Sequence, residues 1–369
     1  MLFLSLGSNL GNRAQYLQHA LFQLHREVGE VVRVSSLYES PAWGFSSTPF
    51  YNICAELRTD LPLETLLPKL HTIEARLGRV RTATPSEGYK ARTLDIDILY
   101  YGDRVVQTDT LCVPHPQLAL RRFVLQPLAD IAPDFADPVK KQTITALLQA
   151  CPDTAILTLV KQTFVLPVRK ANIPYHYITV EGNIGAGKTS LATRLAKDFS
   201  GQLLLEEFAT NPFLEDFYKA PKQYALATEL NFLKERYKQL QQTLTQTEYP
   251  LLVADYAFFK SLIFAQETLP FKEYTLYEEL FLLLFERMIK PDLYIYLHQQ
   301  PDILLKNIQK RGRSFELPIS KDYLERIEQS YLSFLERNPS LHTLFIDVSY
   351  MDFVNNEDDY EFITALITQ

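Results

Sequence analysis

The residues whose spacing most clearly predicts chemistry are those of segment 182–189, which fit the phosphate-binding pattern G-x-x-x-x-G-K-[ST]. Its glycines allow the backbone to turn N–H groups onto a polyphosphate, because no Cβ blocks the approach. In this pattern the lysine contacts the β- and γ-phosphates and the threonine hydroxyl binds Mg²⁺. The residues predicted to bind the triphosphate are Gly182, Asn183, Ile184, Gly185, Ala186, Gly187, Lys188 and Thr189.

The flanking sequence supplies the elements that position this loop. The β-branched run 178–180 predicts a buried strand before it, and residues 188–199 predict a helix after it. The N-terminus of that helix would direct the positive end of its dipole at the anion. An accidental glycine-rich turn would not need both elements, so this half of the chain is predicted to bind a nucleoside triphosphate.

Acidic residues follow two further predicted strands of this half. The run 203–205 is typical of a buried strand and ends in Glu206, and the run 251–254 ends in Asp255. Ligands of an open parallel sheet collect at the carboxyl ends of its strands. We therefore predict Glu206 as a general base and Asp255 as a metal or substrate ligand. The other strands predicted for this parallel sheet are 293–297 and 343–346.

Further charged residues in this half have a spacing that suits a closing site. A helix predicted over 222–246 places Glu229 and Arg236 two turns apart on one face. The basic stretch 310–313 precedes Glu316 and would form a cationic flap that closes over phosphates. A solvated basic stretch is the alternative interpretation.

In the first half of the chain the candidate chemistry lies in segment 92–99, where a strand period of two places Asp95 and Asp97 on one face. Two close carboxylates repel each other unless a cation lies between them, and two Mg²⁺ ions carrying a nucleotide would supply it. A solvated outer face of an edge strand is the alternative. Basic residues around the segment favour a triphosphate site, and these are Arg79, Arg81, Arg92, His115 and Arg121.

The elements predicted around this segment are strands and helices that suggest an α+β domain with its helices on one face of a sheet. Asn12 is of a residue type that caps helix N-termini. The predicted strands are 2–6, 31–38, 50–57 and 155–159, and the predicted helices begin after Asn12 or span 63–77 and 144–150.

Residues 1–160 resemble 6-hydroxymethyl-7,8-dihydropterin pyrophosphokinase, because five motifs occur in that family's order: 6–12, 51–52, 78–81, 92–97 and 113–116. The resemblance implies a ferredoxin-like fold that transfers the β,γ-pyrophosphate of ATP to the hydroxymethyl group of a dihydropterin alcohol. It implies two Mg²⁺ ions on Asp95 and Asp97. It implies ATP contacts from the catalytic Arg81 and Arg92 and from His115 and Arg121, and a pterin slot of Tyr51, Asn52 and Phe123.

One segment departs from that family. Members have Trp-Gly-Pro directly before the position of Arg92 and a further arginine upstream, where this chain has Gly-Tyr-Lys-Ala at 88–91. Tyr89 can still stack on the pterin, and Lys90 can supply the missing cation. We therefore expect the loop 82–91 to be where the kinetics of this enzyme differ from those of the family.

Residues 173–369 resemble the deoxynucleoside kinases through segments 182–189, 205–213, 235–237 and 311–313 together with Tyr218 and Asp255. The resemblance implies that Glu206 accepts the proton of the sugar 5′-hydroxyl as this oxygen attacks the γ-phosphate. It implies that Asp255 holds Mg²⁺ through water. Tyr218 and Glu316 would bind the 3′-hydroxyl, and Arg311 and Arg313 would form a catalytic lid.

Two positions depart from the deoxynucleoside kinase pattern. Many members have an arginine where this chain has Tyr256, so one cation expected beside Glu206 is absent. Members usually read the nucleobase with glutamine, and Glu229 stands at that position. A carboxylate only accepts hydrogen bonds, and this suits guanine, whose N1–H and amino group both donate. The substrate prediction is therefore deoxyguanosine, unless Arg236 simply neutralises Glu229.

Composition limits the remaining possibilities. A length of 369 residues suggests two domains at roughly 150 residues each, which we place at 1–165 and 175–369 with a linker at 166–174. The net charge of −7 argues against binding to nucleic acid or anionic membranes. Three cysteines without C-x-x-C spacing indicate reduced thiols in a cytoplasmic protein. An apolar helix predicted over 274–288 would join two copies into a homodimer.

The leading hypothesis is a bifunctional enzyme, a pterin pyrophosphokinase followed by a deoxynucleoside kinase, each with its own ATP and Mg²⁺. One alternative makes the second domain a nucleoside monophosphate kinase, and another makes it a non-catalytic nucleotide sensor that regulates the first. Glu206 and Tyr218 favour a nucleoside substrate, because a sensor has no use for a base beside the sugar.

Overall fold

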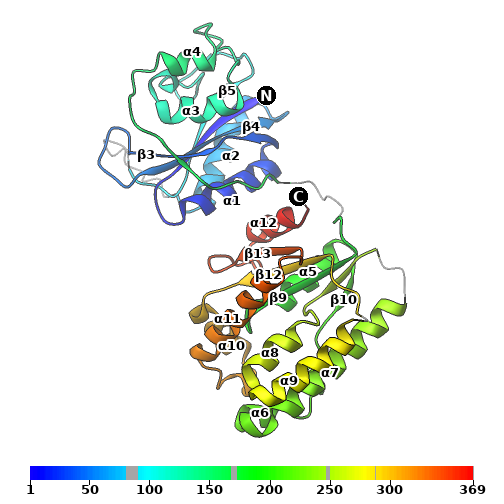
Figure 1. Ribbon diagram of the computed structural model, residues 1–369. Helices are drawn as coiled ribbons and strands as arrows, with labels where there is room; N and C mark the ends of the chain where they lie inside the picture. Colours follow the sequence, from blue (N-terminus) through cyan, green and yellow to red (C-terminus); the bar gives the residue numbers. More distant parts are fainter. Residues whose placement is uncertain (80–89, 168–172, 247–249, 287, 369) are drawn as a thin grey trace. The chain divides into compact units, whose positions relative to one another are not determined.

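The computed structural model describes residues 1–79, 90–167, 173–246, 250–286 and 288–368. The chain forms two compact units, Met1–Arg169 and Lys170–Gln369 (Figure 1). Cys54, Cys112 and Cys151 are free thiols. None of the described helices combines the length and the apolar character needed to cross a membrane.

The first unit is organised around an antiparallel sheet with the strand order β5-β1-β4-β3-β8, in which β2 also pairs with β4. Its strands are β1 (Leu2–Ser8), β2 (Glu30–Val34), β3 (Leu37–Ser40), β4 (Phe50–Arg58), β5 (Asp95–Tyr101) and β8 (Thr158–Val160), with a separate pair of β6 (Val106–Gln107) and β7 (Cys112–Val113). Its helices are α1 (Arg13–Glu27), α2 (Leu63–Arg76), α3 (Arg122–Ile131) and α4 (Ile144–Gln149).

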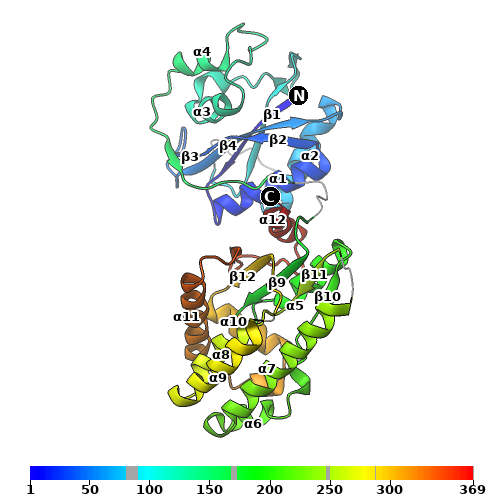
Figure 2. The same cartoon turned by 45° about the vertical axis from the view of Figure 1, so that its right-hand side comes forward.

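Helices cover both faces of this sheet, so the prediction of helices on one face only is wrong (Figure 2). Leu2, Leu4 and Leu6 of β1 belong to the core cluster that contains α1 and α2. Phe3, which points to the opposite face, belongs to the cluster that contains α3 and α4. The physical reason is that the second face of the sheet also carries apolar side chains, among them Phe3 of β1 and Cys54 of β4, and these must be buried.

Most other elements of this unit lie close to their predicted positions. Asn12 caps α1 by accepting a hydrogen bond from the backbone N–H of Gln15. The strand predicted over 31–38 is interrupted, because the Ser35 hydroxyl accepts the backbone N–H of Cys54 at 2.9 Å and replaces a ladder bond. The interruption divides this segment into β2 and β3, which both pair with β4.

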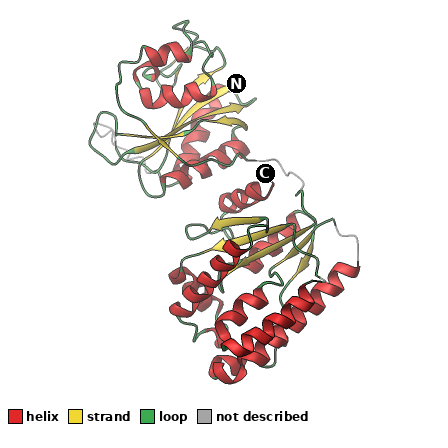
Figure 3. Cartoon of the chain, viewed as in Figure 1, coloured by secondary structure: helices red, strands yellow, loops and turns green. Residues whose placement is uncertain are grey.

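The second unit contains a parallel sheet with the order β10-β11-β9-β12-β13, as expected for an α/β domain (Figure 3). One face of the sheet packs against α5, α10 and α12 and the other against α7, α8 and α9, and α11 contributes to both cores. The strands are β9 (Tyr177–Gly182), β10 (Gln202–Leu204), β11 (Leu252–Ala254), β12 (Leu293–His298) and β13 (Thr343–Asp347). The helices are α5 (Lys188–Asp198), α6 (Leu214–Lys219), α7 (Pro221–Gln246), α8 (Lys260–Thr268), α9 (Phe271–Phe285), α10 (Pro301–Arg311), α11 (Lys321–Arg337) and α12 (Glu357–Thr368).

The carboxyl ends of β10 and β11 place two acidic residues side by side. Leu204 pairs with Ala254 in the parallel register, so Glu206 and Asp255 leave the sheet next to each other. The prediction that 203–205 is a buried strand is wrong, since β10 is a half-buried edge strand and Leu205 lies exposed beyond its end.

Candidate active sites

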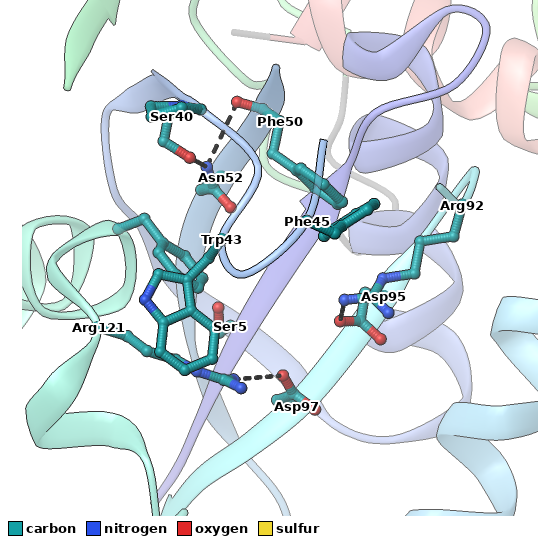
Figure 4. A pocket seen from close by; sticks show the side chains of 13 residues that line it. Ser5, Ser40, Trp43, Phe45, Phe50, Asn52, Arg92, Asp95, Asp97 and Arg121 are labelled. Carbon is teal, nitrogen blue, oxygen red and sulfur yellow. Dashed lines mark hydrogen bonds and ion pairs between the residues drawn. The ribbon is translucent and has the colours of Figure 1, made fainter. Parts of the chain in front are cut away.

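A pocket in the first unit, here called the first pocket, lies between side chains of β1, β3, β4 and β5, the loop after β3 and the start of α3 (Figure 4). Asp95 and Asp97 both line it, whereas Ile96 between them is buried in the core. The strand period therefore predicts the geometry of the two carboxylates correctly. The lining residues are Ser5, Gly7, Ser40, Pro41, Trp43, Phe45, Phe50, Asn52, Arg92, Asp95, Asp97, Arg121 and Phe123.

The two carboxylates of the first pocket differ in their partners. Asp95 forms ion pairs with Arg79 at 2.5 Å and Arg92 at 2.7 Å, whereas Asp97 has Arg121 at 3.9 Å. Burial, followed by the charge of Asp95, raises the pKa of Asp97 to about 7. A divalent cation would relieve this repulsion. Carboxylate oxygens are hard ligands, and Mg²⁺ typically takes one or two of them together with substrate phosphates, so the donor set fits Mg²⁺.

Tyr51 does not contribute to the first pocket, contrary to the prediction that its ring stacks there. Phe50 and Asn52 of β4 line the pocket, and the strand period turns Tyr51 to the opposite face. The Tyr51 ring there lies under the Arg13 guanidinium, 3.6 Å from its central carbon. Asn52 and Phe123 do line the pocket as predicted, and Asn52 donates a hydrogen bond to the Ser40 hydroxyl at 2.9 Å (Figure 4).

The sequence interpretation missed three aromatic residues of the first pocket, namely Trp43, Phe45 and Phe50. The guanidinium carbon of Arg121 lies 4.8 Å from the Trp43 ring centroid and 5.8 Å from that of Phe123. A signal was present, since Trp43 is the only tryptophan of the chain and stands in a segment with proline and glycine but without charge.

The remaining predicted ATP contacts of this unit do not all lie in the first pocket. Arg92 and Arg121 line the first pocket. His115 does not line the pocket. Its Nδ1 accepts a hydrogen bond from the backbone N–H of Gln117 at 3.2 Å. Burial, followed by the charge of Arg121, lowers the pKa of His115 to about 4, so its imidazole is neutral at pH 7. Arg81 and most of the loop 82–91 lie outside the described residues.

A second pocket of about 300 Å³ lies in the second unit, between the loop after β9, the ends of β10 and β11, and α6, α7, α8, α10 and α11. It brings together residues predicted from seven separate segments. Those that line it are Ile184, Gly185, Lys188, Thr189, Glu206, Tyr218, Glu229, Arg236, Asp255, Arg311, Arg313 and Glu316.

The loop after β9 has the backbone that its glycines allow. Gly187 adopts φ 90° at the start of α5, and a Cβ there would lie 2.7 Å from the Phe353 ring. Lys188 Nζ donates to the carbonyl oxygens of Gly182 and Asn183 at 3.0 and 2.9 Å. Burial, followed by the charge of Lys260, lowers the pKa of Lys188 to about 8.

The two predicted Mg²⁺ ligands of the second pocket lie in contact. The Thr189 hydroxyl donates to Asp255 Oδ2 at 2.6 Å, and Asp255 Oδ1 accepts the backbone N–H of Glu206 at 2.8 Å. A hydroxyl and a carboxylate side by side, next to a phosphate-binding loop, are a hard oxygen set that suits Mg²⁺ bound mainly to phosphates and water.

Glu206 pairs with two cations, although the arginine expected at position 256 is absent. Arg236 donates to its Oε1, and Lys260 donates to its Oε2 at 2.6 Å. Burial by itself raises the pKa of Glu206, but the charges of Lys260 and Arg236 outweigh this and hold the pKa well below its ordinary value. The alternative that Arg236 neutralises Glu229 finds no ion pair in its support, because the Arg236 guanidinium donates to Glu206 and Ser261.

Glu229 is a buried acid with an open acceptor. Its Oε1 accepts a hydrogen bond from the Thr268 hydroxyl at 3.1 Å, and its Oε2 has no partner among the described residues. Burial raises the pKa of Glu229 to about 7, although Arg236 lowers it. An unsatisfied carboxylate oxygen beside a cavity can accept hydrogen bonds from a ligand.

The flap residues surround the remaining side of the second pocket. Glu316 forms ion pairs with Arg311 and, at 3.1 Å, with Arg313. Arg313 also stacks on Phe208, with 3.9 Å between its guanidinium carbon and the ring centroid. Burial and then the charge of Glu316 raise the pKa of Tyr218, which is therefore a neutral hydrogen-bond donor at pH 7.

Comparison with known proteins gives a consistent result for each unit. Residues 178–369 match the family described as deoxynucleoside kinase, and residues 3–133 match the family described as 7,8-dihydro-6-hydroxymethylpterin-pyrophosphokinase. The deoxyguanosine kinase of Bacillus subtilis is 37% identical over 200 residues, which are 52% of this chain and 96% of that protein. The deoxyadenosine kinase of Dictyostelium discoideum is 32% identical over 203 residues, 54% of this chain and 82% of that protein.

For the first unit, the 2-amino-4-hydroxy-6-hydroxymethyldihydropteridine pyrophosphokinase of Synechocystis sp. is 42% identical over 152 residues. The match covers 41% of this chain and 76% of that protein.

Proposed function

Because the chain belongs to the deoxynucleoside kinase family and carries a 7,8-dihydro-6-hydroxymethylpterin-pyrophosphokinase domain ahead of it, we propose that each of its two pockets is a complete active site. The protein is a bifunctional transferase. It transfers pyrophosphate from ATP to 6-hydroxymethyl-7,8-dihydropterin in folate biosynthesis, and phosphate from ATP to the 5′-hydroxyl of a deoxynucleoside in salvage. Family membership favours these activities over a nucleoside monophosphate kinase or a nucleotide sensor.

In the first pocket, we assign the pterin to the space between Phe50 and Phe123, with Asn52 hydrogen bonding its edge. Mg²⁺ bound to Asp95 and Asp97 would neutralise the triphosphate charge. Arg92 and Arg121 would then hold the phosphates in line with the hydroxymethyl oxygen. The chemistry is positioning and charge stabilisation, since in-line attack on phosphorus needs no covalent step by the protein.

We assign a ferredoxin-like fold to this unit. The supporting observation is the order of its elements, β1-α1-β2/β3-β4-α2-β5, together with the sheet order β5-β1-β4-β3. An antiparallel sheet built from two interleaved β-α-β units has this pattern.

In the second pocket, we assign the role of general base to Glu206 and the binding of the ATP phosphates to the loop after β9. The 5′-hydroxyl gives its proton to Glu206 as its oxygen forms a bond to the γ-phosphorus, and the bond from that phosphorus to the ADP oxygen breaks. Lys188 and the lid residues Arg311 and Arg313 stabilise the charge on the transferring group. Mg²⁺ near Thr189 and Asp255 would neutralise the β- and γ-phosphates. Tyr218 and Glu316 bind the sugar 3′-hydroxyl.

The nucleobase preference is proposed to be deoxyguanosine. Glu229 lies in the second pocket with an acceptor that no described residue occupies, and guanine presents two donors on one edge. Arg236 donates its hydrogen bonds to Glu206 and Ser261, so the Glu229 carboxylate is not already satisfied by that guanidinium. The similarity to a deoxyguanosine kinase over 96% of its length agrees with this preference.

We also propose that the kinase units pair into a homodimer through α9. Leu276, Leu280 and Leu283 form one stripe of this helix and are 64%, 40% and 67% exposed. Such a stripe in water is typical of an interface. Leu283→Glu is expected to convert the dimer to monomer in light scattering, whereas Val354→Glu, an exposed apolar residue outside α9, is the control that keeps the dimer. A wild-type monomer at micromolar concentration would contradict the proposal.

The observation that carries the proposed function is the clustering of the predicted acid, base and phosphate-binding residues in two pockets. The test supplies the purified chain with ATP and Mg²⁺ and either the dihydropterin or each of the four deoxynucleosides. Asp97→Ala should lose only the pterin reaction, and Glu206→Gln only the nucleoside reaction. If either substitution removed both activities, the assignment of two separate sites would be wrong.

A further inference from the structure

The carboxylate of Glu206 lies between two cations that come from different helices. Arg236 of α7 donates to Oε1 through Nε at 2.8 Å and Nη2 at 2.5 Å. Lys260, the first residue of α8, donates to Oε2 through Nζ at 2.6 Å. Lys260 is only 7% exposed and lines the second pocket, so its charge is directed into the site and not to solvent.

We propose that Lys260 is the positioning residue for the base Glu206 and replaces the arginine that many deoxynucleoside kinases have at the position of Tyr256. The inference rests on the assignment of Glu206 as the base. It adds a residue that neither the phosphate-loop pattern nor the flap pattern includes.

Position 256 is unable to supply this cation in the present chain. Tyr256 is fully buried, and its hydroxyl donates to Gln239 Oε1 at 2.8 Å. It does not line the second pocket. The first turn of α8 begins directly after the Asp255 loop, and its residue Lys260 reaches the same carboxylate from there.

The hydrogen bonds on Glu206 leave a defined place for the substrate. A carboxylate has about four acceptor positions, two on each oxygen. Arg236 occupies both positions of Oε1, and Lys260 occupies one of Oε2. The position left open is the second one of Oε2, and this is where the 5′-hydroxyl donates. Lys260 therefore decides which oxygen acts as the base and how it is oriented.

The surroundings of Lys260 argue against a purely structural role. A buried ammonium is costly unless it is paired, and its paired carboxylate is the base itself. An apolar residue would suit a site that only needed to be filled.

The test compares Lys260→Met, Lys260→Arg and Glu206→Gln with wild type in the full chain, using deoxyguanosine, ATP and Mg²⁺. Lys260→Met should lower kcat by about 10²-fold with a smaller change in the deoxynucleoside KM, because a mispositioned base acts mainly in the transition state. Lys260→Arg should restore most of kcat.

The control is Lys234→Met, which removes a lysine that is 63% exposed on α7 and should leave kcat and the deoxynucleoside KM unchanged. The proposal is overturned if folded Lys260→Met keeps kcat within about threefold of wild type, or if its loss of activity lies in the deoxynucleoside KM and not in kcat. If Lys260→Met does not fold, a Lys260→Arg variant that folds but is inactive overturns it. An active Glu206→Gln would instead refute the base assignment, independently of Lys260.

Discussion

Replacing Glu229 by glutamine is the most direct test of how the second pocket selects its nucleobase. The substitution keeps the shape of the side chain and replaces one acceptor by an NH₂ donor. Thr268 can still donate to the remaining oxygen, as it does to Glu229 Oε1 at 3.1 Å. The group that faces the substrate then changes from an acceptor to a donor, which opposes the donors of guanine.

The expected magnitude follows from one charged hydrogen bond. Such a bond contributes about 1.5–3 kcal/mol, which corresponds to about a 10- to 150-fold loss of kcat/KM for deoxyguanosine. Adenine presents one donor and one acceptor on the same edge, so deoxyadenosine should be phosphorylated as well as before or better. The ratio of the two kcat/KM values should therefore change by at least as much as the value for deoxyguanosine alone.

The pH dependence gives an independent check on the wild type. Burial raises the pKa of Glu229 to about 7, in spite of the neighbouring Arg236 and Lys260 and with a contribution from Glu206. The carboxylate accumulates as pH rises through 7, from about 9% at pH 6 to about 91% at pH 8. The deoxyguanosine-to-deoxyadenosine ratio should therefore rise about tenfold between these pH values. Comparing the ratio cancels Lys188, whose pKa of about 8 affects both substrates.

The assay measures initial rates of ADP formation with each deoxynucleoside in wild type and Glu229→Gln from pH 6 to pH 8. The variant should show a flat substrate ratio across this range. An equal loss for both nucleosides, or a deoxyguanosine rate that the substitution leaves unchanged, would refute a role for Glu229 in reading the base.

Two further substitutions test the geometry of each unit. Phe50→Ala should raise the pterin KM by about 5- to 150-fold through the lost stacking. Tyr51→Ala should change the pterin KM by less than about threefold, since Tyr51 faces Arg13 on the other side of β4. A larger effect of Tyr51→Ala than of Phe50→Ala in a coupled pyrophosphoryl-transfer assay would contradict the orientation of β4. Gly187→Ala should lower the melting temperature of the second unit by about 2–8 °C and weaken ATP binding, because φ 90° and the Phe353 ring leave no room for a Cβ. An unchanged melting curve with normal ATP titration would exclude that strain.

Local features of both sites could be predicted because they depend on backbone geometry within a few residues. The phosphate-binding loop is contiguous between a strand and a helix, so its residues define its shape. The shared face of Asp95 and Asp97 follows from the period of a single strand, which requires no knowledge of neighbouring strands. The acids after β10 and β11 follow from the rule for parallel sheets.

Which face of an apolar strand meets the pocket could not be predicted in the same way. β4 carries buried side chains on both faces, so its period says that Phe50 and Tyr51 point in opposite directions but not which of them meets the pocket. The helices that pack over each face decide which side chain meets the pocket, and helices on both faces of the first sheet were not predicted.

The sequence by itself determined the two kinds of phosphate chemistry, because short motifs and strand periods set side-chain positions over a few residues. Only the tertiary structure decided how Glu206 is held. Arg236 and Lys260 lie 30 and 54 residues away along the chain, and their contacts with Glu206 depend on how α7 and α8 pack against the sheet. Burial of a charge among packed helices requires a partner of opposite sign, and packing rather than local spacing selects which residue provides it.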